Sequence, residues 1–178
     1  KETRFAEPLT AYPKQRTFRP FLRAASSWAK CKPKDVDRDH VDVVIIQRKQ
    51  TRRVLNLPEL VQAAKSIAGV RDVRVLRLEE LPLREQLIKV ACGNTIVAGV
   101  QGAGLGWSEY LGELGFRSGL IEWHWLGWRS IYAGLNKQAQ EMGTLKTIAR
   151  YVRAWNCTQP QRCRPGGEGK AADVNVDV

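Results

Sequence analysis

The residues best suited to chemistry are the glycines of a short stretch, GVQGAGL, at residues 99–105. It follows the apolar residues 95–98 and precedes residues 104–111, for which the sequence predicts a helix. Gly102 and Gly104 have no Cβ, so a bulky anion can approach their backbone closely. Free N–H groups at the start of a helix would favour an anion at the same point. However, the stretch has neither the GxGxxG fingerprint nor the Gly-Lys-Ser/Thr of a P-loop, so a tight turn without a ligand is the alternative.

Charged residues lie at the ends of two other predicted strands. Arg48 and Arg52 follow a strand at 41–46, and Glu122 lies in a strand at 120–125. Ligands of open parallel sheets bind beyond the carboxyl ends of the strands, so we expect these side chains near the glycines. Guanidinium groups bind phosphate bidentately, and a carboxylate accepts hydrogen bonds from ribose hydroxyls. The alternative is that the arginines are solvated and that Glu122 pairs with a neighbouring arginine.

The elements that must position these residues alternate along the chain. Hydrophobic patterning predicts strands at 41–46, 70–78, 95–100, 120–125 and 145–152, and helices at 58–68, 83–91, 104–111 and 129–142. Prolines stand where helices are expected to begin, and Gly69 and Gly93 stand where two of them end. The continuous β-branched run at 41–46 predicts a strand that is buried on both faces. The fold class is therefore α/β, a Rossmann-like parallel sheet with helices on both faces.

The chain divides into three parts by composition. Residues 1–40 are interrupted by prolines and predict an irregular connecting segment, with a modest helix at 21–30 that packs on the domain. Residues 41–155 form the α/β domain. Residues 156–178 are rich in Gln, Pro, Gly and Lys, and we expect a disordered tail.

Composition restricts the class of protein. The chain has 178 residues, of which 43% are hydrophobic, enough for one core, and no apolar run is long enough for a membrane helix. A formal charge of +11 suits an anionic ligand or partner, nucleic acid among them. Three tryptophans gather near one strand end, in contrast to the basic, aromatic-interleaved faces that stack bases, so no nucleic acid is expected.

Four cysteines are present without a CxxC motif, which argues against a zinc ribbon or a thioredoxin-type site. Cys157 and Cys163 enclose a short loop that a disulfide would close, and their pairing stays open. Cys92 lies at the end of a predicted helix and is interpreted as a buried thiol. The glycosylation acceptor pattern at 156–158 agrees with the secretory pathway, the lumen of the endoplasmic reticulum or Golgi. The chain begins with Lys1, so we expect a signal or anchor upstream of it.

Four stretches resemble motifs of the family 61 glycosyltransferases, which include protein O-GlcNAc and O-mannose-linked GlcNAc transferases and plant xylan arabinosyl- and xylosyltransferases. VIIQRKQTRRVLN at 44–56 resembles the strand-and-loop motif of the family, and LREQLI at 83–88 its helix before the glycine turn. GVQGAGL resembles the family's GVHGAGL, and GLIE at 119–122 its following strand. The order and spacing agree from about residue 41 to residue 155.

The resemblance implies the C-terminal, donor-binding half of a GT-B fold. It implies a UDP-sugar as donor, transfer with inversion, and a protein or glycan acceptor. No metal cofactor is expected, since positive side chains and a helix end would offset the charge of the leaving group. The implied donor-binding residues are Arg48 and Arg52 at the diphosphate, the backbone of Gly102, Ala103 and Gly104, and Glu122 at the nucleoside.

Gln101 stands where the family has a histidine before Gly-Ala-Gly. A glutamine donates a hydrogen bond but carries no positive charge, so support of the leaving diphosphate is weaker. Gly106-Trp107-Ser108 also replaces a segment that is often Thr-Asn in the family. Two functions therefore stay open, a glycosyltransferase and a catalytically impaired relative that binds a nucleotide-sugar or a partner. The sequence assigns no catalytic residue, sugar or oligomeric state, and it leaves open an N-terminal half upstream.

Overall fold

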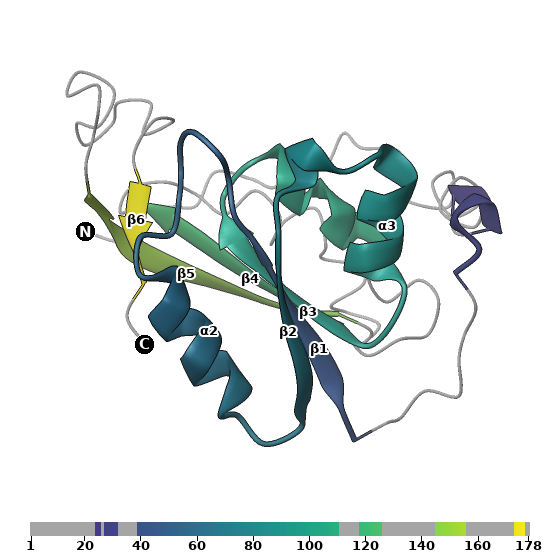
Figure 1. The fold of residues 1–178 in the computed structure, drawn as a ribbon, viewed down its shortest axis with the longest axis horizontal. Helices are drawn as coiled ribbons and strands as arrows, with labels where there is room; N and C mark the ends of the chain where they lie inside the picture. The colour runs from purple at the N-terminus through teal and green to yellow at the C-terminus, as the bar shows by residue number, and fades with distance from the viewer. Residues whose placement is uncertain are drawn as a thin grey trace, which may run out of the picture.

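The computed structural model describes residues 24–25, 27–31, 39–110, 118–125, 145–155 and 173–176. Strands and helices alternate over most of this part of the chain (Figure 1). In chain order they are β1 (Val41–Ile46), α2 (Leu57–Lys65), β2 (Val70–Leu76), the 3-10 helix η2 (Leu78–Glu80), α3 (Leu83–Ala91), β3 (Thr95–Val100), the 3-10 helix η3 (Ala103–Tyr110), β4 (Ser118–Trp125), β5 (Leu145–Trp155) and β6 (Asp173–Asn175).

The described strands form one sheet in the order β2-β1-β3-β4-β5-β6. The first five run parallel, and β6 pairs antiparallel with β5. From β1 the chain moves outward to β2 and then returns to the other side of β1 as β3. The connections therefore diverge between β1 and β3, which makes this point the topological switch of the sheet. The predicted α/β, Rossmann-like class is confirmed.

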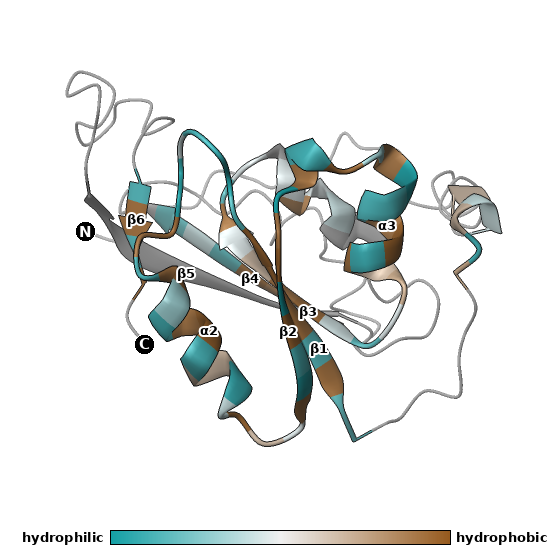
Figure 2. Ribbon diagram, in the orientation of Figure 1, coloured by the Kyte–Doolittle hydropathy of each residue, from teal (hydrophilic) through white to brown (hydrophobic). Residues whose placement is uncertain are grey.

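β1 is buried on both faces, as predicted. Val43 and Ile45 pack in the cluster that includes α2, whereas Val44 and Ile46 pack in the cluster that includes α3. Figure 1 shows the two helices on opposite faces of the sheet. Figure 2 shows hydrophobic residues along β1 and β3, and alternating hydrophobic and hydrophilic positions on both helices. Each helix thus turns an apolar stripe toward the sheet.

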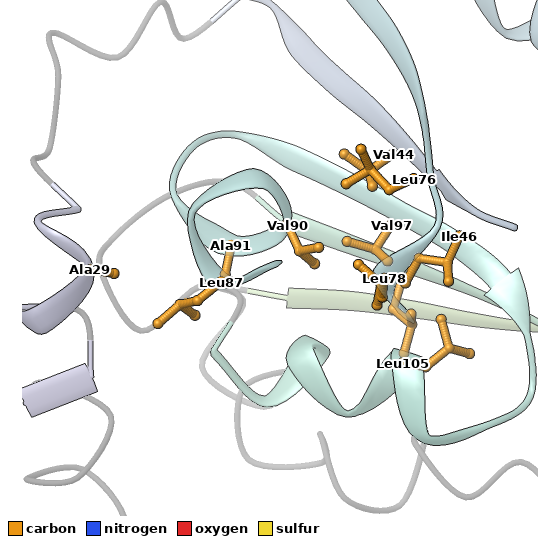
Figure 3. Packing of buried hydrophobic residues seen from close by; sticks show 11 residues of the cluster. Ala29, Val44, Ile46, Leu76, Leu78, Leu87, Val90, Ala91, Val97 and Leu105 are labelled. Atoms are coloured by element: carbon orange, nitrogen blue, oxygen red, sulfur yellow. The ribbon is translucent and has the colours of Figure 1, made fainter. Parts of the chain in front are cut away.

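The α3 side of the core holds the glycine turn, residues 99–105, in place (Figure 3). Leu105 of η3 is buried among Ile46, Leu78 and Val97. A Cβ on Gly99 would stand only 3.1 Å from Cδ2 of Leu105 and 3.3 Å from Cβ of Ile46, so a side chain at this position would crowd both residues. Close packing against Leu105 therefore explains this glycine without a ligand.

The segment at 104–111 differs from its prediction. It is a 3-10 helix, in which the Leu105 N–H donates to the Gly102 carbonyl oxygen at 2.9 Å. Glycines at 102, 104 and 106 lower the α-helix propensity of this segment, which favours the tighter turn. The expected start of an α-helix beside the glycines is therefore wrong. The predicted helix at 129–142 lies outside the described residues.

Two other expectations change. Cys92 forms a disulfide with Cys31, with the Cα atoms 5.3 Å apart, so its interpretation as a buried thiol is wrong. Residues 24–25 and 27–29 are helical and Ala29 is buried in the core, which places part of the N-terminal segment on the domain. The expected disorder of 156–178 does not hold for residues 173–176, which contain β6. Cys157 and Cys163 lie outside the described residues.

Candidate functional site

A cleft of about 550 Å³ opens at the carboxyl ends of β1 and β3. This is the topological switch of the sheet, where open α/β folds bind their ligands. The volume is in the range of pockets for small molecules and cofactors. The lining has a polar side from the loop after β1 and an apolar side from η2, η3 and the strand ends: Ile46, Arg48, Lys49, Gln50, Thr51, Leu78, Glu79, Gln86, Val100, Gly104, Leu105 and Trp107.

Arg48 and Arg52 lie in the loop between β1 and α2, which we name the arginine loop, and their side chains converge on the glycine turn. A Cβ on Gly102 would stand 2.7 Å from Nη1 of Arg52 and 2.9 Å from Nη1 of Arg48. Arg52 also donates from Nη1 to the Gln101 carbonyl oxygen at 2.5 Å. The structure thus brings Arg48, Arg52 and Gly102 together, and their binding of a diphosphate stays a prediction.

The convergence of two cations is electrostatically unfavourable without a counterion, because like charges that share a site repel each other. Arg48 forms no salt bridge with any carboxylate in the described part of the chain. An anion at this point would offset both charges and accept hydrogen bonds from both guanidinium groups. The geometry therefore suits a phosphate group.

The loop that carries the arginines is closed at its base by the buried side chain of Gln47. Its Nε2 donates to the Val54 carbonyl oxygen at 3.1 Å, and its Oε1 accepts from the Val54 N–H at 2.9 Å. Within the loop, Arg52 has a φ of 58°, in the left-handed region that residues with a Cβ rarely adopt. This bend turns the Arg52 side chain back toward the glycine turn.

Hydrogen bonds with Glu122, Trp123 and Arg52 hold Gln101, which is only 2% exposed. Its Nε2 donates to Oε1 of Glu122 at 2.9 Å, and its backbone N–H donates to the Trp123 carbonyl oxygen at 2.8 Å. Its own carbonyl oxygen accepts the bond from Arg52. The side chain of Gln101 thus points to a buried carboxylate, and its backbone connects the glycine turn to the arginine loop.

Glu122 is fully buried and does not line the cleft. The structure therefore brings it to Gln101 and leaves no exposed oxygen for a nucleoside. Gly104 does line the cleft, and Ala103 is the first residue of η3. Of the implied donor-binding residues, Arg48 and Gly104 line the cleft, and Arg52 and Gly102 lie next to Arg48 outside that lining. Gln101 and Glu122 are buried and do not line it.

Sequence reasoning missed three residues of the cleft. Glu79 of η2 lines it and accepts a hydrogen bond from the Lys49 N–H at 2.7 Å. Trp107 lines the apolar side and donates from Nε1 to Oε1 of Gln86 at 3.0 Å. Gln86 in turn donates from Nε2 to the carbonyl oxygens of Leu78 and Leu81, both at 2.9 Å. The position of Glu79 just after β2, equivalent to that of Arg48 after β1, was the available signal.

Among the residues with described placement, no group of three or more His, Cys, Asp or Glu side chains is arranged to hold a metal ion. The same residues include no helix with the length and apolar character to cross a membrane.

Comparison with known proteins gives the chain a family. Residues 3–107, more than half of the chain, match the family Glycosyltransferase 61. A search of curated proteins found no match. The family match begins within the N-terminal segment, for which the sequence predicts a connector, and it ends at Trp107. It therefore includes β1, the arginine loop and the glycine turn but not Glu122. The chain belongs to glycosyltransferase family 61.

Proposed function

We propose that this chain is the donor-binding portion of an inverting glycosyltransferase that uses a UDP-sugar and a protein or glycan acceptor. Family membership supports the transferase activity. The observation that carries the donor assignment is the convergence of the Arg48 and Arg52 guanidinium groups on Gly102, beside a cleft at the switch point of the sheet. The resemblance to the C-terminal half of a GT-B enzyme is part of the same proposal.

The two sides of the cleft suggest how the donor lies. The diphosphate meets Arg48 and Arg52, where two guanidinium groups and a residue without a Cβ leave room for it. The nucleoside extends along the apolar side, against Leu78 and Trp107. The carboxylate of Glu79 is placed to accept hydrogen bonds from ribose hydroxyls, the role that the sequence had assigned to the buried Glu122.

The chemistry on this proposal is a single displacement. The acceptor hydroxyl oxygen attacks the anomeric carbon and loses its proton to a general base. The bond from that carbon to the diphosphate breaks, and UDP leaves with the electron pair and a growing negative charge. Fixed positive groups beside the leaving oxygens lower the barrier to this step. Arg48 and Arg52 supply them, so the proposal includes no metal ion.

A catalytically impaired relative is the second candidate, and Gln101 is the observation that favours it. Its side chain amide is bonded to Glu122 and supplies no positive charge to a leaving group. On this reading the chain binds the nucleotide-sugar without efficient transfer.

We place the protein in the secretory pathway. The disulfide between Cys31 and Cys92 supports this, because structural disulfides persist in oxidising compartments. The glycosylation acceptor pattern at 156–158 agrees.

Thermal unfolding with added UDP tests the proposed function. UDP at a hundred times its dissociation constant stabilises the folded state by about 2.7 kcal/mol. The stabilisation should be lost in Arg48→Ala and kept in Lys65→Ala, which removes an exposed charge from the last turn of α2, outside the cleft lining. Stabilisation by duplex DNA with no response to UDP, GDP or ADP would contradict the proposal.

A further inference from the structure

The segment at 173–176 lies against the loop that carries the two arginines, although about 120 residues separate them. Figure 1 shows β6 beside the connection from β1 to α2. The Val174 N–H donates to the Arg53 carbonyl oxygen at 2.8 Å, and the Leu55 N–H donates to the Val174 carbonyl oxygen at 2.9 Å. Val174 is fully buried. The end of the arginine loop is therefore paired with a distant strand.

A second pair of bonds continues this contact toward α2. The Asn56 side chain donates to the Val176 carbonyl oxygen at 2.6 Å and accepts from the Val176 N–H at 3.0 Å. An amide side chain that bonds both the N–H and the carbonyl oxygen of one residue fixes the register between the two segments. The contact is thus a defined pairing along several residues.

Asp173 adds a buried carboxylate to this pairing. Its Oδ1 accepts from the Arg53 N–H at 2.9 Å, and its Oδ2 accepts from Nε and Nη2 of Arg53 at 3.0 and 2.6 Å. Asp173 is only 2% exposed, whereas the Arg53 side chain is half exposed. The hydrogen bond and charge of Asp173 raise the pKa of Arg53 above its usual value, so this arginine stays protonated. One carboxylate therefore holds both the backbone and the side chain of Arg53.

Arg52, the residue before Arg53, has a strained backbone. Arg52 adopts a φ of 58°, which costs free energy for a residue with a Cβ and persists only where the surroundings enforce it. On one side the Arg52 guanidinium is bonded to the Gln101 carbonyl oxygen. On the other side, the N–H and carbonyl of Arg53 are fixed by Asp173 and Val174.

We propose that Asp173 is a positioning residue for the donor diphosphate. From β6 it holds Arg53, and through Arg53 it keeps the backbone of Arg52 in the conformation that directs its guanidinium to Gly102. Neither Asp173 nor Arg53 lines the cleft, so the effect on a ligand is indirect. The inference rests on the proposed function, because it concerns how the same site is held.

The test compares Asp173→Asn with a matched control, Asp42→Asn. Asp42 also accepts two bonds from one arginine, from Nε and Nη2 of Arg71 at 2.9 and 3.0 Å, but it lies at the amino end of β1, away from the cleft. Each substitution removes a carboxylate charge and keeps the shape of the side chain. Calorimetric titration of the whole chain with UDP measures the affinity of each variant.

We expect UDP to bind Asp173→Asn about tenfold more weakly, as when a tenth of the molecules hold the competent loop. Asp42→Asn should bind UDP like the native chain, even if both variants lose thermal stability. Hydrogen exchange should become faster at the amides of residues 53–55 only in Asp173→Asn. If Asp173→Asn fails to fold, Arg53→Lys serves instead, because it keeps the charge and loses the two-point contact.

Two negative outcomes are distinguishable. If the native chain binds UDP and Asp173→Asn or Arg53→Lys binds it equally well, the role of Asp173 is overturned while the proposed function stands. If the native chain does not bind UDP, the proposed function fails and this inference fails with it.

Discussion

At the scale of single residues, substitution of Gly102 tests diphosphate binding most sharply. A Cβ there would stand within 3 Å of a nitrogen atom on each of Arg48 and Arg52, and both are the ends of flexible side chains. We therefore expect the Gly102→Ala variant to fold normally, with the guanidinium groups of Arg48 and Arg52 moved apart by the new methyl group. Loss of a charge-assisted hydrogen bond costs about 1.5–3 kcal/mol, so UDP should bind at least about tenfold more weakly.

The same turn offers the control. Nothing lies within 4 Å of a Cβ built on Gly106, so Gly106→Ala should bind UDP like the native chain. Calorimetry on both variants gives the comparison. Equal affinities would mean that the space at Gly102 has no part in binding.

Gln101 is the second residue with a sharp prediction. A histidine in its place would face the buried carboxylate of Glu122, which favours the charged imidazolium. We expect Gln101→His to increase the rate of sugar transfer from a UDP-sugar donor by about a hundredfold, the factor that corresponds to a barrier lower by about 2.7 kcal/mol. UDP affinity should change little, since the arginines and the glycine turn are unaltered.

The rate of the native protein decides between the two candidate functions. If it transfers sugar as fast as Gln101→His, no charged group is needed at this position. The impaired-relative candidate then loses its support.

At the scale of elements, the disulfide between Cys31 and Cys92 ties the N-terminal helical residues to the end of α3. It closes a loop of about 60 residues, so replacing both cysteines by serine should lower the free energy of unfolding by about 2–4 kcal/mol. Cys92 precedes β3, at the opposite end of that strand from the cleft. UDP affinity should therefore be unchanged, and a parallel loss of affinity would show that the bridge supports the site. Chemical denaturation and calorimetry on the same variant measure both quantities.

Elements with local signals were predictable from the sequence. The β-branched run of β1 was confirmed with its bounds, and α3 was confirmed between Pro82 and Gly93, because proline and glycine fix helix ends through their own backbone preferences. Gly93 directly follows the C-cap of α3 and adopts a positive φ, whereas α2 ends at Lys65, before the predicted stop at Gly69. By contrast, η3 is a 3-10 helix and not the predicted α-helix. Its glycines have low α-helix propensity, so the packing of Leu105 in the core determines its conformation.

Features that depend on distant contacts were not predictable. β6 has three residues, and besides β5 it contacts residues 53–55 about 120 positions earlier, so composition alone indicated disorder. The burial of Glu122 was equally hidden. Its strand is covered on both faces, and alternation along such a strand does not say which polar side chain meets water. The nearness of Arg48, Arg52 and Gly102, in contrast, was expected, because the alternation of elements indicated a parallel sheet, whose strands end at one edge.

At the scale of the whole molecule, the sheet order places the ends of β1 and β3 side by side, and both candidate phosphate-binding segments follow these strands. The central claim is that a nucleoside diphosphate binds there. The most direct measurement is a nuclear magnetic resonance titration of the labelled chain with UDP, which follows backbone amide and arginine side-chain signals. The account predicts saturable shifts concentrated at Arg48, Arg52 and residues 101–107. Saturable shifts that spare these residues, or no shifts at millimolar UDP, would contradict it.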